Sequence, residues 1–368
     1  MTRWLHPRAV FDGETLKPDM AVAIETERVV AIVPLIDLPE GTVPETVDAI
    51  LSPGLFDVQV NGGGGVMLNN DPTRGGVRKI AAAHRSVGTA FILPTVITDL
   101  PEITERAAEA VLAEHGKGGV LGIHIEGPHI SFAHKGTHDP ARIRPYDART
   151  RDLLMRLRQH GLPVLFTVAP ETLEPGVIAD LSAMGVTVAA GHSAATAEQT
   201  ERALAEGLAG FTHIFNGMPQ MTSRAPGIIA AALNSEAYCG IIADGHHVDD
   251  RVVRLAFRAR PIRGRMVLVS DAMSTIAGPD HFTLYGETIR VLDGKLVNAN
   301  GSLAGAHIDL KTSVARLIAI VGVPTIEALA SATTCPRAFM GIEQQEMVGS
   351  ALEELFFASN RPSGPRAK

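Results

Sequence analysis

Short runs of β-branched and apolar residues recur through the middle of the chain, and each run ends in glycine, proline or polar residues. Most of these runs are continuous rather than alternating, which is typical of strands buried on both faces. We expect eight strands, at Leu55–Val60, Thr89–Leu93, Val120–Ile125, Val164–Val168, Val186–Ala190, Gly210–Phe215, Cys239–Ala243 and Met266–Val269.

Helical patterns separate most of these runs. The clearest lie at Gly76–Ser86, Asp99–His115, Asp147–His160, Glu174–Met184, Ala195–Ala205 and Asp249–Arg258. Strands that alternate with helices indicate parallel βαβ units. Eight such units predict an α/β fold, a (β/α)8 TIM-like barrel.

The two ends of the chain have a different pattern. Short strands are expected at Ala21–Ile24 and Arg28–Val33, and a hairpin at Phe282–Val297 with its turn at Asp293–Gly294. We therefore expect a small β-sandwich domain built mainly from residues 1–52 and 336–368, and a catalytic barrel at residues 53–335. The hairpin is interpreted as an extension of the last barrel loop.

Composition excludes several classes of protein. The 368 residues carry a net charge of −7 and few aromatic residues, which argues against a nucleic-acid binder. Two cysteines exclude a disulfide scaffold, and the chain has no stretch of 18 apolar residues that would span a membrane. We expect a soluble, cytoplasmic protein without a membrane partner. The 14 histidines are unexplained by composition alone.

Polar residues gather where the predicted strands end, and in a barrel those ends meet at one face. Glu126 follows the third strand, His192 follows the fifth, and His213 lies in the sixth. One carboxylate and two imidazoles suit a divalent ion such as Zn²⁺, with a position left for water. Asp271 follows the eighth strand, where it could act as a general base toward that water.

Other motifs lie at the same face. His124-x-Glu126 matches the start of a nucleobase deaminase motif, but the P-C-x-x-C that should follow is missing. The glycines of Asn61–Gly65 do not form a Walker loop and could simply allow close backbone packing. Hydrogen-bond donors and positive charge on other barrel loops suggest an anionic, phosphorylated substrate; they come from Asn216, Gly217, Arg224 and His247.

Seven segments in this order carry a resemblance to a known family. They are PGLFDVQVNGGGG at 53–65, HIEGPHISFAHKGTH at 124–138, GHSAAT at 191–196, THIFNGMPQMTSRAPG at 212–227, ADGHHV at 243–248, VSDAM at 269–273 and GSLAGA at 301–306. Together they resemble the N-acetylglucosamine-6-phosphate deacetylase family of the amidohydrolase superfamily, over roughly residues 51–340.

The resemblance implies hydrolysis of the acetamide of N-acetyl-D-glucosamine 6-phosphate to D-glucosamine 6-phosphate and acetate. It implies Glu126, His192 and His213 as metal ligands, Asp271 as catalytic acid and base, and His138 as the residue that polarises the carbonyl. It also implies substrate contacts from Asn216, Gly217, Arg224, His247 and Leu303. One basic phosphate contact comes from a neighbouring subunit in that family, which implies a homodimer with active sites near the interface.

The chain departs from the superfamily pattern at two places. Gln59 and Asn61 stand where many amidohydrolases carry two histidines for a second metal, and amides bind such a metal poorly. We therefore expect one divalent ion per chain, with Zn²⁺ ranked first and Fe²⁺, Co²⁺ or Mn²⁺ as alternatives. The superfamily's usual C-terminal ending is not evident in Gly349–Phe357, so the layout of the last strands stays open.

Three alternatives stay open for the function. The substrate could be the galactosamine epimer, N-acetylgalactosamine 6-phosphate. It could be another phosphorylated N-acetyl sugar, cleaved by a related amidohydrolase. The chain could also be a non-catalytic sugar-phosphate binding protein that keeps the fold.

Overall fold

Eight parallel strands form a barrel in the computed structural model, which describes residues 2–299 and 301–359. Each strand pairs with the next one in chain order. The strands are β6 (Leu55–Val60), β9 (Thr89–Ile97), β10 (Ile123–Glu126), β11 (Val164–Val168), β12 (Thr187–Ala190), β13 (Gly210–Phe211), β14 (Tyr238–Ile242) and β15 (Met266–Val269). A parallel bridge between Val60 and Ala272 closes the ring just beyond β15.

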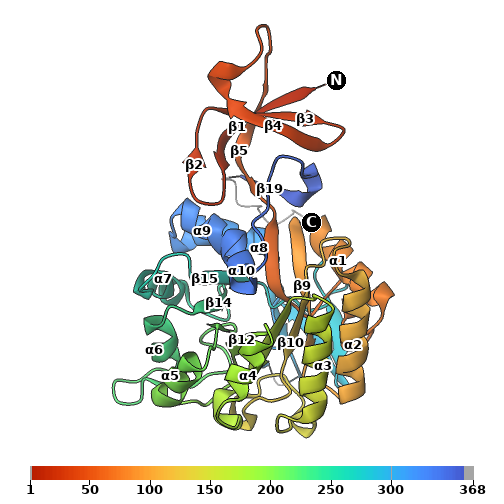
Figure 1. Cartoon of the computed structure of the whole chain (residues 1–368), viewed down its shortest axis with the longest axis vertical. Helices are drawn as coiled ribbons and strands as arrows, with labels where there is room; N and C mark the ends of the chain where they lie inside the picture. The colour runs from red at the N-terminus through yellow and green to blue at the C-terminus, as the bar shows by residue number, and fades with distance from the viewer. Residues whose placement is uncertain (1, 300, 360–368) are drawn as a thin grey trace.

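Helices follow the strands and cover the outside of the barrel (Figure 1). They are α1 (Arg74–Ser86), α2 (Pro101–Glu114), α3 (Ala148–Gln159), α4 (Val177–Ala183), α5 (Ala197–Ala205), α6 (Gly227–Asn234), α7 (Asp250–Ala259), α8 (Leu310–Arg316), α9 (Thr325–Ala332) and α10 (Thr334–Met340). Leu317–Val321 continues α8 as a π-helical turn, and 3₁₀ turns lie at Leu35–Asp37, Phe132–His134, Pro140–Arg142, Pro170–Thr172 and Leu352–Glu354.

Capping side chains explain where several of these helices begin. The Asp147 carboxylate accepts the backbone N–H of Thr150 at the start of α3, and Asp309 does the same for Thr312 at the start of α8. At α5, Thr196 and Gln199 form a reciprocal capping box. These side chains satisfy backbone donors that have no partner within the helix.

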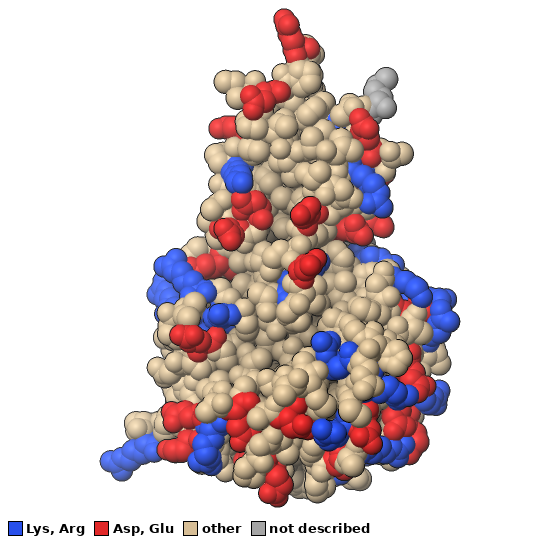
Figure 2. Space-filling view, in the orientation of Figure 1, with Lys and Arg blue, Asp and Glu red and all other residues tan. Residues whose placement is uncertain are grey.

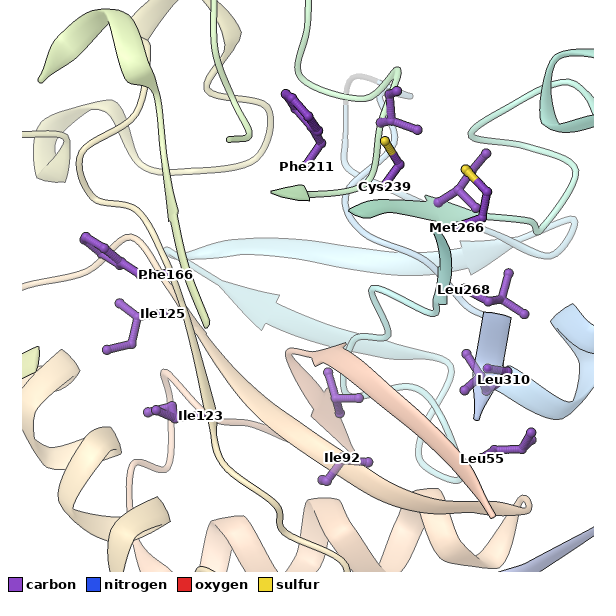
Figure 3. Close-up of a cluster of buried hydrophobic side chains, with 14 of the residues drawn as sticks. Leu55, Ile92, Ile123, Ile125, Phe166, Phe211, Cys239, Met266, Leu268 and Leu310 are labelled. Carbon is purple, nitrogen blue, oxygen red and sulfur yellow. The ribbon is translucent and has the colours of Figure 1, made fainter. Parts of the chain in front are cut away.

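The two faces of each barrel strand pack into different clusters. Ile123 and Ile125 of β10 face the helices in the large outer cluster, part of which Figure 3 shows. The alternate residues, His124 and Glu126, lie on the opposite face because side chains alternate along a strand. At the amino ends of the strands, Phe339 of α10 packs close to Gly210 and joins the apolar cluster inside the barrel. The polar side chains are therefore concentrated at the carboxyl ends.

A separate six-stranded sheet lies beyond the end of the barrel that α9 and α10 cover (Figure 1). Its strands are β1 (Arg3–Phe11), β2 (Leu16–Lys17), β3 (Met20–Glu25), β4 (Arg28–Pro34), β5 (Glu45–Pro53) and β19 (Leu355–Ala358). β19 pairs antiparallel with β5, so the end of the described chain joins the N-terminal strands. The six strands are joined by hydrogen bonds into one sheet.

Two small hairpins lie at the carboxyl face of the barrel. The first pairs β7 (Gly62–Gly63) with β8 (Val66–Met67), directly after β6. The second has three antiparallel strands and is called the hairpin below. They are β16 (His281–Leu284), β17 (Glu287–Leu292) and β18 (Lys295–Val297). Asp293 and Gly294 both have positive φ in the two-residue turn between β17 and β18, as this turn type requires.

The predicted barrel and the separate β-structure are confirmed. Helices α6, α8, α9 and α10 were not expected, nor were strands β1 and β5. The domain boundaries at residues 52/53 and 335/336 stay predictions, and residues 360–368 of the second terminal segment lie outside the described residues.

Acidic and basic side chains are interspersed over the barrel face shown in Figure 2. Among the described residues, no helix combines the length and the apolar character needed to cross a bilayer.

Candidate active site

Three side chains from separate strand ends converge at the carboxyl face of the barrel. Glu126 is the last residue of β10, His192 follows β12, and His213 follows β13. The Nε2 atoms of His213 and His192 lie 2.9 and 3.2 Å from Glu126 Oε1, and 3.1 Å from each other. All three residues are buried. This is the trio that the sequence predicts as metal ligands.

The surroundings of this trio fit a divalent cation. His192 Nδ1 donates its hydrogen to the backbone carbonyl of His134 at 2.8 Å, which leaves the Nε2 lone pair directed at the cluster. His192 and His213 both have positive φ, 49° and 29°, a strained conformation that is common at functional sites. Gly217 has a φ of 60°, and a Cβ there would lie 2.7 Å from His192 Nδ1, so only glycine leaves room for this ring.

The charges within the cluster support one another. Burial by itself would raise the pKa of Glu126, but the two imidazoles lower it well below its ordinary value. Burial likewise disfavours a charged His213, yet the Glu126 carboxylate raises the pKa of His213. The buried carboxylate thus favours positive charge beside it, whether on an imidazole or on a bound cation.

Gln59 and Asn61 contact the carboxylates through their amide nitrogens. Gln59 Nε2 donates to both oxygens of Glu126 and to Asp271 Oδ1, each at 3.2 Å. Asn61 Nδ2 donates to Asp271 Oδ1 at 2.6 Å. Amide nitrogens that donate in this way orient the two carboxylates and are not directed as ligands toward a second metal.

Asp271 lies on the segment that closes the barrel. Its backbone N–H donates to the Gln59 carbonyl at 3.1 Å, and its φ is 51°. Burial, followed by the nearby Glu126 charge, raises the pKa of Asp271 above its ordinary value. A carboxylate that holds a proton more tightly than usual is suited to take one from water and to release it later.

His138 reaches the cavity from the loop after β10. The backbone N–H of Thr98 donates to its Nδ1 at 3.3 Å, and the Thr98 hydroxyl lies 2.6 Å from the same nitrogen. Burial lowers the pKa of His138 well below its ordinary value, so the ring is neutral. With Nδ1 as acceptor, the single proton sits on Nε2, which can donate a hydrogen bond. Thr98 carries no motif, and sequence reasoning missed it.

The cluster opens into a cavity of about 180 Å³. Its lining includes nine of the residues singled out from the sequence: Glu126, His138, His192, His213, Asn216, Gly217, His247, Asp271 and Leu303. Asn61, Ile97, Thr137 and Met273 complete much of the remaining wall. Arg224 lies outside this lining, in the exposed segment 220–226.

Asp244 orients His247 at the wall of the cavity. Its carboxylate lies 2.6 Å from His247 Nδ1 and accepts the backbone N–H groups of residues 246 and 247. Burial alone would raise the pKa of Asp244, but these hydrogen bonds lower it to about 2. Asp244 is therefore ionised at neutral pH. Sequence reasoning missed this role, although the three-residue spacing to His247 is visible in the ADGHHV segment.

The remaining polar residues near the cluster have structural partners. His124 lies between the hydroxyls of Thr95, at 3.2 Å, and Thr167, at 2.7 Å, and burial lowers its pKa to about 4. In the glycine-rich loop, the N–H groups of Gly64 and Gly65 donate to the carbonyls of Ile276 and Ser274. This contact favours the close-packing interpretation of that loop.

Asp57 lies at the seam between β6 and β15 and is fully buried. It accepts the backbone N–H groups of Gln59, at 3.1 Å, and of Ser270, at 3.2 and 3.3 Å. Burial raises its pKa from 3.8 to about 7. Because the pKa of Asp57 is higher in the folded state than in the unfolded state, the group's contribution to stability is fully present below pH 3.8. This contribution is lost as the pH rises through about 7.

We expect the Asp57→Asn variant to lack this pH dependence. The difference in unfolding free energy, wild type minus variant, should fall by up to about 4 kcal/mol between pH 4 and pH 7. Urea unfolding at a series of pH values measures it. A difference that stays constant over this interval would show that Asp57 is ionised throughout.

Comparison with known proteins places this site in a family. No family profile matches the chain. The chain is 40% identical over 310 residues to the N-acetylgalactosamine-6-phosphate deacetylase of a Shewanella species, covering 82% of this chain and 76% of the relative. It is 31% identical over 338 residues to the N-acetylglucosamine-6-phosphate deacetylase of Haemophilus influenzae, covering 89% and 87%.

A solved structure agrees over nearly the whole chain. It is a mutant of the N-acetyl-D-glucosamine-6-phosphate deacetylase from Mycobacterium smegmatis, in complex with N-acetyl-D-glucosamine-6-phosphate. It superimposes with a TM-score of 0.85 at 26% identity and covers 95% of this chain and 93% of the other. By sequence and by fold, this chain belongs to the family of N-acetylglucosamine-6-phosphate and N-acetylgalactosamine-6-phosphate deacetylases.

Proposed function

We propose that the protein hydrolyses the acetamide of N-acetyl-D-glucosamine 6-phosphate to D-glucosamine 6-phosphate and acetate. The observation that carries this proposal is the convergence of the Glu126, His192 and His213 cluster with Asp271 and His138 in one cavity. A ligand trio, a basic carboxylate and a neutral hydrogen-bond donor are the groups that amide hydrolysis needs.

We propose that one divalent ion per chain is held by Glu126, His192 and His213. When bound, such an ion supplies Lewis acidity, which polarises a carbonyl and strengthens water as a nucleophile at neutral pH. The carboxylate and imidazole donors rank Zn²⁺ first, with Fe²⁺, Co²⁺ or Mn²⁺ as alternatives. The hydrogen bonds from Gln59 and Asn61 to the carboxylates support a single ion.

The protein's own groups carry the proton transfers in this proposal. Asp271, held by Asn61 and Gln59, takes a proton from the attacking water and delivers it to the amine as the C–N bond breaks. His138 donates its Nε2 hydrogen to the acetamide oxygen and to the negative charge that develops there. Leu303 lies on the cavity wall, and we assign it to the acetyl end of the substrate.

The phosphate end is assigned to His247, Asn216 and the Gly217 backbone on the cavity wall. Because Arg224 lies outside that wall on an exposed segment, we propose that it serves the active site of a second copy in a homodimer. Met221, on the same segment as Arg224, and Phe132, in the loop after β10, are 50% and 65% exposed and offer apolar surface for such an interface.

A mixing experiment tests whether Arg224 acts across subunits. Arg224→Ala alone should raise KM by about 10- to 100-fold, because a charge-assisted hydrogen bond is lost. Co-expression with Asp271→Asn should then give about a quarter of all sites the wild-type KM, because half of the randomly paired dimers would hold one intact site. Activity at a substrate concentration well below the KM of Arg224→Ala measures these sites. Arg106→Ala, on the exposed face of α2, is the control. Mixed dimers without restored activity would place Arg224 in its own subunit's site.

The galactosamine epimer is a second candidate substrate. The observation that favours it is the 40% identity to a relative named for N-acetylgalactosamine 6-phosphate. Acetate release from both epimers, compared as kcat/KM, tests the choice. A higher kcat/KM on the glucosamine substrate supports the first proposal, and the reverse order supports the second. No acetate from either would support a non-catalytic sugar-phosphate binder.

We also propose a cytoplasmic location. It is supported by the two cysteines, Cys239 and Cys335, which are both free thiols.

A further inference from the structure

The hairpin of β16, β17 and β18 packs over the cavity wall. Its apolar side chains Phe282, Leu284, Ile289 and Leu296 form one cluster with Met67, Ile97, Met273 and Ala304. Ile97 and Met273 also line the cavity. A bridge from Val297 to Leu303 connects the hairpin to a third part of the same wall. The hairpin therefore packs against the cavity wall through this apolar cluster.

Tyr285 connects the hairpin to the barrel loops by polar contacts. It lies in the turn between β16 and β17 with a φ of 50°. Its hydroxyl donates to the backbone carbonyl of Thr98 at 2.5 Å. The Arg142 guanidinium lies 5.1 Å from the centre of its ring, and Arg142 also pairs with Asp99 and with Asp139. The hydroxyl and the ring of Tyr285 are thus both held in place by neighbouring residues.

Thr98 is the residue that fixes His138. Its backbone N–H and its hydroxyl both contact His138 Nδ1, so the hydrogen of the neutral ring is on Nε2. The Tyr285 hydroxyl binds the carbonyl of this same residue. A continuous set of hydrogen bonds therefore runs from the hairpin turn through one threonine to the ring that faces the cavity.

We propose that Tyr285 is a positioning residue for the deacetylation, acting on His138 through Thr98. The hairpin aligns the Nε2–H of His138 with the substrate carbonyl only when the Tyr285 hydroxyl holds Thr98 in place. This inference rests on the proposed function, because it assigns His138 the task of hydrogen-bonding the acetamide oxygen.

The first test is Tyr285→Phe, which removes the hydroxyl and keeps the ring against Arg142. We expect kcat on the acetyl substrate to fall about five- to tenfold, with KM within about twofold of wild type. The N-trifluoroacetyl analogue has a more electrophilic carbonyl and depends less on a hydrogen-bond donor. We therefore expect its kcat to change by less than about twofold.

Tyr146→Phe is the matched control, because the Tyr146 hydroxyl is buried without a hydrogen-bond partner among the described residues. This variant should keep wild-type kcat on both substrates. The urea midpoints of both variants should stay near that of the wild type. Equal losses of kcat on the acetyl and trifluoroacetyl substrates would overturn the proposal, because a general disturbance of the hairpin affects both.

A double-mutant cycle gives a second test. If Tyr285 acts through His138, adding Tyr285→Phe to His138→Gln should leave kcat unchanged relative to His138→Gln alone. If the two effects multiply, Tyr285 acts elsewhere and the proposal fails. Both experiments compare variants with a wild type that releases acetate. A wild type without this activity would instead contradict the proposed function.

Discussion

Asp271→Asn is expected to lower kcat by about a thousandfold while the protein retains its metal. The amide has nearly the same shape as the carboxylate but cannot accept a proton from water or deliver one to the amine. Glu126, His192 and His213 are unchanged, so the three proposed ligands remain. Steady-state kinetics and metal analysis of the same preparation measure the two quantities.

Asp152→Asn is a suitable control, because Asp152 lies exposed on α3. It should leave both kcat and metal content at the wild-type level. Near-normal turnover in Asp271→Asn would remove Asp271 from its proposed role as acid and base. Loss of metal in that variant would instead make Asp271 a ligand.

Glu126→Gln is expected to abolish both metal retention and activity. Glu126 supplies the single negative charge of the ligand trio, and it lies within 3.2 Å of both imidazole Nε2 atoms. A neutral amide is a much weaker ligand for a divalent ion. After dialysis we expect less than about a tenth of an ion per chain, and a lower unfolding temperature because a stabilising ligand is lost.

Glu109→Gln, on an exposed position of α2, provides the matching control. It loses one carboxylate at the surface and should keep its metal and its rate. A Glu126→Gln protein that still holds one ion per chain would place the metal elsewhere. Such a result would also show that the buried cluster does not hold the metal that the reaction uses.

The barrel could be predicted because its strands are buried on both faces. Continuous apolar runs such as Val164–Val168 stand out, and this run matches β11 residue for residue. Burial also explains why the ligand trio was recognisable: a carboxylate or imidazole at the end of such a run must face its neighbours at one end of the barrel. Glu126, His192 and His213 are brought together by this geometry although 87 positions separate the first from the last.

Other elements carry too little signal in the sequence. Helix α6 is eight residues long and almost wholly apolar, so it shows no amphipathic period. Strand β19 has four residues, and its pairing with β5 depends on a contact about 300 positions away. Part of the site was equally hard to predict from the sequence. Thr98 and Tyr285 interact through a backbone carbonyl and a hydroxyl, and no sequence motif marks either residue.

We expect acetate release from N-acetyl-D-glucosamine 6-phosphate to depend on one divalent ion held by Glu126, His192 and His213. The most direct test measures acetate from the purified wild type before chelation, after chelation, and during titration with Zn²⁺, Fe²⁺, Co²⁺ or Mn²⁺. We expect chelation to stop acetate release and activity to return fully at about one equivalent of ion per chain. A chelated, metal-free protein that releases acetate at the original rate would contradict this expectation, as would a protein that releases none with any of these ions.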